Sequence, residues 1–60
     1  MKKPDYAIAM ELRMNDKDLN KKFLNLPDKI KWKWLAYACN HKPFESLGYA
    51  QSLVNGDDWN

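Results

Sequence analysis

The sequence predicts a mainly α fold, a compact bundle of three or four short helices that forms one small domain over residues 1–60. Prolines and the pairs Asn-Asp and Asn-Gly divide the chain into four segments, each of helix length. Apolar residues recur at spacings of three and four in the central segments, which is typical of amphipathic helices. A chain of 60 residues is also too short for more than one hydrophobic core.

The first segment fits two structures. Its large side chains alternate with small or charged ones, and a period of two indicates a strand. Most of its residues are good helix formers, however, and Pro4 suits the first turn of a helix. We favour a helix, because a lone strand would need a partner to pair with. A short N-terminal strand over residues 6–14 stays the alternative.

The second segment is predicted to be a helix with one apolar stripe. Asn15 is its candidate N-cap residue, because a side-chain oxygen at this position can accept a hydrogen bond from the first turn. Leu19, Phe23 and Leu26 recur at spacings of four and three. We therefore expect this helix to be buried along one side only.

The third segment, "LPDKIKWKWLAYACNH", contains an alternation of lysine with large apolar residues that resembles a strand only in its spacing. Asn25 is its candidate N-cap. On a helix, Ile30 and Trp34 lie on one side, whereas Trp32 and Cys39 lie on nearly the opposite side. A central helix with two apolar faces must pack between neighbours or offer one face to a partner.

The fourth segment has clear helix signals at both ends. Pro43 suits the first turn, Glu45 is acidic near the N-terminus, and the Asn-Gly pair at 55–56 is a good stop. Gly48 in the interior costs about 1 kcal/mol of helix propensity relative to alanine, so we expect a neighbouring backbone to approach it closely. Residues 55–60 form an acidic tail that can be flexible.

Composition excludes several functional classes. With Cys39 as the only cysteine, no internal disulfide can form, and Cys39 with His41 supplies too few ligands for a structural zinc site. We expect a buried thiol at Cys39, a histidine at His41 that bonds to the carbonyls of its helix end, and no catalytic residue, metal or cofactor. No stretch resembles an export signal or a membrane span, so a cytoplasmic protein is expected. Nine lysines and six asparagines against one arginine are compatible with an AT-rich phage or mobile-element gene.

The aromatic and basic residues indicate a partner. Net charge is only +2, but residues 17–33 carry six lysines and residues 43–60 carry only acidic charges. Tryptophan among charged residues is typical of an interface anchor. The expected partner-binding residues are Trp32, Lys29, Lys31, Lys33 and Trp59. They predict a non-catalytic protein-binding module, an adaptor or inhibitor that binds another protein, and self-association as a homodimer is also expected.

A nucleic-acid partner is the alternative, because lysines interleaved with tryptophans combine phosphate neutralisation with stacking surfaces. The run "FLNLPDKIKWKWLAYACNHKPFESLGYAQSLV" resembles the ribbon-helix-helix repressors, in which a strand leads through a proline into two helices. This resemblance implies a dimeric DNA-binding transcriptional regulator, with Phe23 facing the bases and Trp34 in the core; a helix-turn-helix protein is a related possibility. The nucleic-acid-binding residues would be Lys21, Lys22, Asn25, Lys29, Lys31 and Lys33.

Overall fold

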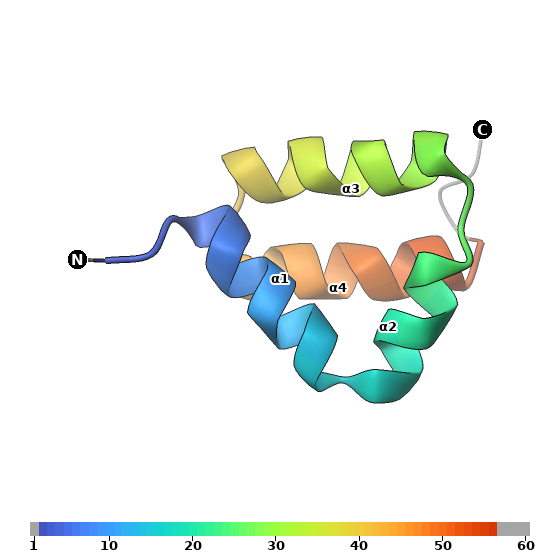
Figure 1. The fold of residues 1–60 in the computed structure, drawn as a ribbon. Helices are drawn as coiled ribbons and strands as arrows, with labels where there is room; N and C mark the ends of the chain where they lie inside the picture. The colour runs from blue at the N-terminus through green and yellow to red at the C-terminus, as the bar shows by residue number, and fades with distance from the viewer. Residues whose placement is uncertain (1, 57–60) are drawn as a thin grey trace.

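A computed structural model describes residues 2–56, and these residues form four helices (Figure 1). The helices are α1 (Asp5–Asn15), α2 (Lys17–Leu24), α3 (Asp28–Asn40) and α4 (Pro43–Val54). The described residues contain no strand, so the predicted mainly α bundle is confirmed. Most of the predicted acidic tail lies outside the described residues.

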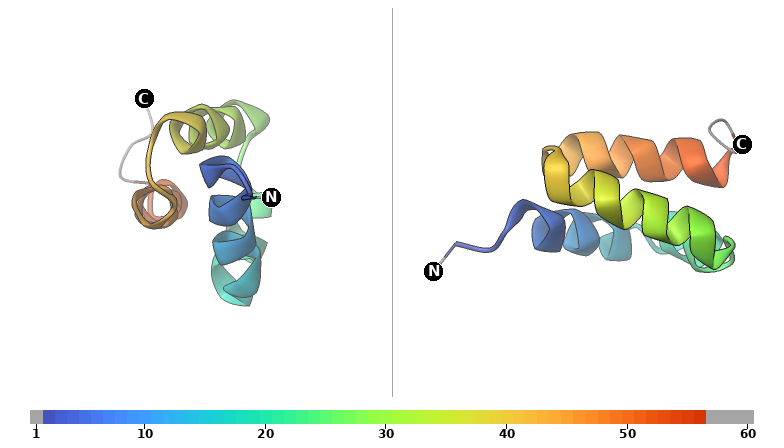
Figure 2. Two further views of the ribbon diagram at one scale, coloured as in Figure 1. Left: turned by 90° about the vertical axis from the view of Figure 1, so that its left-hand side faces the viewer. Right: turned by 90° about the horizontal axis from the view of Figure 1, so that it is seen from above.

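The helices surround a single core. In Figure 1, α3 and α4 run in opposite directions and are joined by a short turn, while α1 and α2 form a V beside them. The end-on view in Figure 2 shows α4, α3 and the α1–α2 pair at the three corners of a triangle. α1 and α4 each pack against all three other helices, whereas α2 and α3 touch each other far less. This divergence of α2 from α3 leaves one side of the core thinly covered.

Every helix contributes to the core. The predicted stripe of α2 is confirmed, since Leu19 and Phe23 are buried and Leu26 packs against the core from the following loop. On α3, the face that carries Ile30 and Trp34 is the inner one. The buried apolar residues are Ala9, Leu19, Phe23, Ile30, Trp34, Ala38, Ala50 and Leu53.

Trp34 lies at the centre of this core and is only 1% exposed. Its indole Nε1–H donates a hydrogen bond of 2.7 Å to the backbone carbonyl of Ser46 in α4. Its ring and that of Phe23 of α2 pack edge to face, at a centroid distance of 5.3 Å and an interplanar angle of 71°. Edge-to-face aromatic pairs of this kind stabilise a core beyond the area that they bury.

Two of the expected helix caps are wrong and the others are confirmed. Asp16, and not Asn15, is the N-cap of α2, because its carboxylate accepts the backbone N–H of Leu19 at 3.2 Å. Asn25 caps the C-terminus of α2 and does not start α3. α4 begins at Pro43 as expected, and the backbone turns at Gly56 with a φ of 80°.

Two segments could have been strands, residues 6–14 and the stretch that leads into Pro27, and neither of them is one. Residues 6–14 lie within α1, so the strand alternative is wrong. In the ribbon-helix-helix register, Phe23 would face the bases, yet it lies in α2 and is buried. Residues 6–14 form a helix because most of them have high helix propensity and because a helix suits their packing. Ala9 and Arg13, four positions apart, share the buried face of α1.

The expectation of close backbone packing at Gly48 is wrong. Gly48 is exposed, and a Cβ atom added to it would meet nothing within 4 Å. We therefore expect Gly48→Ala to raise the free energy of unfolding by about 0.5–1 kcal/mol, because alanine loses less backbone entropy in a helix. A thermal melt followed by circular dichroism would show a melting temperature higher by roughly 4 °C.

Gly56→Ala is the matched control. Its positive φ strains any residue with a Cβ, so this variant should melt below the wild type. A Gly48→Ala variant that also melts below the wild type would contradict the packing described here.

Candidate functional site

A solvent-open groove of about 410 Å³ lies where α2 diverges from α3. α1 provides two of its lining residues, α2 provides two, and α3 provides the remaining five. Six of the nine are apolar or aromatic. The lining residues are Met10, Arg13, Phe23, Leu24, Asp28, Lys31, Trp32, Trp34 and Leu35.

Arg13 covers the aromatic centre of the core. Its guanidinium carbon lies 4.1 Å from the centroid of the Phe23 ring and 4.7 Å from that of Trp34. Its Nε–H donates a hydrogen bond of 3.1 Å to Oδ1 of Asn20 in α2. Arginine suits this position because its planar, weakly hydrated cation stacks on aromatic faces.

The charge of Arg13 has no carboxylate partner among the described residues. Only 8% of this residue is exposed. The ion pairs in this part of the chain join Lys3 to Glu11 and Lys31 to Asp28. Burial lowers the pKa of Arg13 from its ordinary value, because desolvation disfavours the charged form.

The terminal nitrogens of Arg13 reach solvent. Neither of these nitrogens makes a hydrogen bond. Within residues 2–56, every fully buried side-chain nitrogen has a hydrogen-bond partner. These two nitrogens must therefore retain some contact with water. Arg13 is also one of the residues that line the groove.

Trp32 stands at the rim of the groove and is 68% exposed. Lys29 and Lys33 are also exposed; Lys29 is three positions before Trp32 and four before Lys33, so the three side chains lie within about 100° of one another around α3. Lys31 is instead partly buried on the groove side, 3.3 Å from the carboxylate of Asp28. Of the expected partner-binding residues, three thus form one exposed surface and Lys31 belongs to the groove wall.

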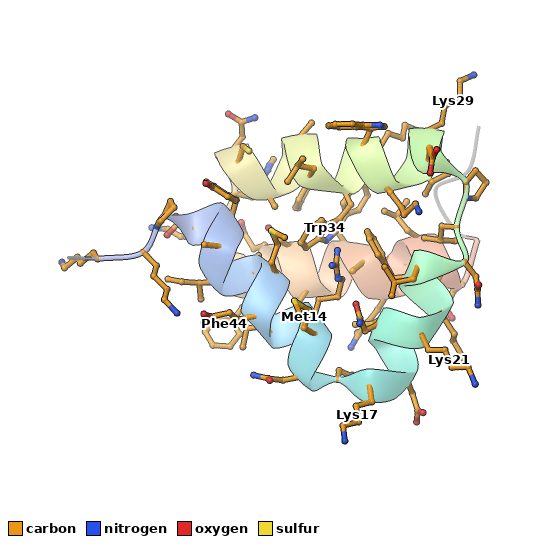
Figure 3. The ribbon with its side chains drawn as sticks, viewed as in Figure 1. Met14, Lys17, Lys21, Lys29, Trp34 and Phe44 are labelled. Carbon is orange, nitrogen blue, oxygen red and sulfur yellow. The ribbon has the colours of Figure 1, made fainter. Side chains whose placement is uncertain are left out.

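The predicted site residues on α2 and in the loop after it belong to another helix than this surface. Trp59 lies outside the described residues. Lys21, Lys22 and Asn25 are exposed on and after α2, and Figure 3 shows Lys29 at the upper right of the molecule and Lys21 at the lower right. Trp34 is buried, so it cannot serve as a stacking surface for a nucleic acid, and only the ribbon-helix-helix resemblance placed it in the core.

Cys39 and His41 line the same hollow at the C-terminal end of α3, and no hydrogen bond joins their side chains. Cys39 is exposed, so the expectation of a buried thiol is wrong; it lies on the outer side of α3. His41 bonds to its helix end as expected, because Nδ1–H donates to the carbonyl of Tyr37 at 2.9 Å, and its ring stacks on that of Tyr37. No group of three His, Cys, Asp or Glu side chains within residues 2–56 could hold a metal ion.

Sequence reasoning missed Arg13. The alternating pattern of its segment bore only on the choice between helix and strand, and nothing nearby marked a site. The available signal was composition: a single arginine stands among nine lysines. Where lysine is otherwise the residue used for surface charge, a lone arginine indicates a position that needs a planar cation.

Comparison with known proteins adds no relative. No protein-family model, curated protein or solved structure matches this chain. Among the described helices, none is long and apolar enough to cross a membrane.

We expect Arg13 to stabilise the fold through its packing more than through its charge. Arg13→Ala should lower the free energy of unfolding by about 2 kcal/mol, because it uncovers the rings of Phe23 and Trp34. Arg13→Met should stay within about 1 kcal/mol of the wild type, since methionine fills similar space and removes a buried charge. Urea unfolding followed by circular dichroism measures both. Equal losses in the two variants would show that the charge itself holds the core together.

Proposed function

We propose that this chain is a non-catalytic, cytoplasmic protein-binding module, an adaptor or inhibitor that uses Trp32 as its anchor. One observation carries the proposal: Trp32 is 68% exposed at the rim of an apolar groove, whereas Trp34, two positions along the same helix, is 1% exposed. Tryptophan is the residue type most enriched among those that dominate protein interfaces.

The size of the domain strengthens this argument. A chain of 60 residues buries only a modest share of its surface, so a large aromatic side chain left outside the core is a loss to folding. A partner that covered Trp32 could also cover Leu24 and Leu35, which line the same groove. These side chains line one groove, and large apolar residues of this kind are typical of the centre of an interface.

Lys29 and Lys33 complete the surface as a charged rim. Both flank Trp32 on the exposed side of α3. Rim charges steer the approach of a partner and add little affinity of their own. We therefore expect the tryptophan to control the dissociation rate and the lysines to affect mainly the association rate.

A protein partner fits these features better than a nucleic acid does. Single-strand binding needs several exposed aromatic rings along a basic track. Trp34 is buried and Lys31 is paired with Asp28, which leaves one exposed tryptophan and two unpaired lysines on this side of α3.

The test compares two exposed aromatic residues. In capture from a lysate of the source organism, a partner bound by the wild type should be lost with Trp32→Ala, whose affinity should fall at least tenfold. The control is Phe44→Ala, which removes a 77% exposed ring that does not line the groove and should leave capture unchanged.

Reversing the charge of Lys29 and Lys33 tests whether these lysines, and not Trp32, are responsible for binding. If Lys29→Glu with Lys33→Glu abolished binding while Trp32→Ala did not, the anchor proposal would fail. Binding to a mixed-sequence DNA duplex that falls steeply as salt rises would then favour the DNA-binding regulator.

A further inference from the structure

The groove combines an apolar wall with a positive charge at its floor. Arg13 lies within it, 92% buried, and no described carboxylate pairs with it. We propose that the groove binds an acidic side chain of the partner protein, carried on an apolar stretch of that partner, with the carboxylate bonded to the guanidinium of Arg13. This inference rests on the proposed function, because it takes Trp32 and the groove as one binding surface.

The hydrogen-bonding state of Arg13 defines how the carboxylate would approach. A guanidinium has five N–H donors, and the single donor on Nε is already used by Asn20. The four donors on the terminal nitrogens make no hydrogen bond within the described chain. They point to an end-on, two-bond contact with a carboxylate, the geometry in which arginine binds acids most strongly.

Burial makes this contact selective. A cation that has lost part of its water is costly unless a counter-charge is near, so an incoming carboxylate would relieve a cost already present in the free protein. The attraction is also stronger than at the surface, because a groove walled by side chains has a lower effective dielectric constant than water. A neutral amide of the same shape carries no counter-charge, so it would do little to relieve the cost of the buried cation and would gain little from the stronger attraction.

The other charges of the groove do not oppose an acid. Among the described residues that line it, Arg13 and Lys31 are the cations and Asp28 is the only carboxylate. Asp28 is 3.3 Å from the ammonium of Lys31, which neutralises it. The groove therefore has a net positive charge, complementary to an acidic group.

The apolar lining indicates a protein segment in preference to a small anion. Inorganic phosphate would satisfy Arg13 and leave Leu24, Trp32 and Leu35 uncovered. A segment that presents large apolar side chains on both sides of its acid would cover them as well. Interface grooves between helices commonly receive such amphipathic segments.

The experiment is an unbiased peptide selection. A library of random twelve-residue peptides displayed on phage would be panned against the full chain. Enriched peptides should share one aspartate or glutamate between large apolar residues. For a representative synthetic peptide, changing the acid to its amide should weaken binding at least tenfold, measured by fluorescence polarisation.

Variants then locate the acid. Arg13→Met should bind the acid and amide peptides with nearly equal affinity. Leu24→Ser, at the rim and 55% exposed, should weaken both peptides several-fold. Met14→Ser is the matched control, since Met14 is 56% exposed and does not line the groove. If Arg13→Met does not fold, two comparisons still test the proposal. One compares the acid and amide peptides on the wild type, and the other compares Leu24→Ser with Met14→Ser.

Each contrary outcome has a separate meaning. Enriched peptides that lack an acid but need Trp32 would overturn this inference and leave the proposed function standing. Peptides that need the acid but bind equally well to Leu24→Ser and Trp32→Ala would place the acid elsewhere and overturn it too. A library without enriched peptides, or a dimer in sedimentation equilibrium that buries the groove against a second copy, would also overturn it.

Discussion

The contact set of the Trp34 indole is the interaction on which the rest of the structure depends. Its N–H is bonded to the Ser46 carbonyl of α4, its ring packs edge to face with Phe23 of α2, and the guanidinium of Arg13 of α1 lies over it. One side chain of α3 thus contacts all three other helices. In a domain without a disulfide, this convergence compensates for the small number of large buried residues.

The same contacts create the groove. α2 and α3 diverge, so the rings of Phe23 and Trp34 would face water if nothing lay over them. An aliphatic residue would close the core and leave an inert surface. Arg13 covers the rings with a planar cation instead, and its terminal nitrogens keep a positive charge at the surface of an apolar cleft. Stability and binding capacity therefore arise from one side chain.

The sequence predicted the helices well and the site in part, and the difference has a physical cause. Periodicity identifies residues that share a helix face, so the two faces of α3 and the exposure of Trp32 could be predicted. Periodicity does not predict how one helix packs against another, and the burial of Arg13 in α1 depends on that packing. The exposed positions of Gly48 and Cys39 have the same origin, since each depends on where a neighbouring helix does not pack.

The most direct test of this account uses the fact that the chain contains a single arginine. Its Nε–H gives one cross-peak in a ¹⁵N–¹H correlation spectrum, which needs no assignment among several arginines. We predict a peak shifted upfield by the ring currents of Phe23 and Trp34, and protected from exchange with water by burial and by the bond to Asn20. A peak at the position of free arginine, exchanging rapidly with water, would contradict the placement of Arg13 and with it the charged groove.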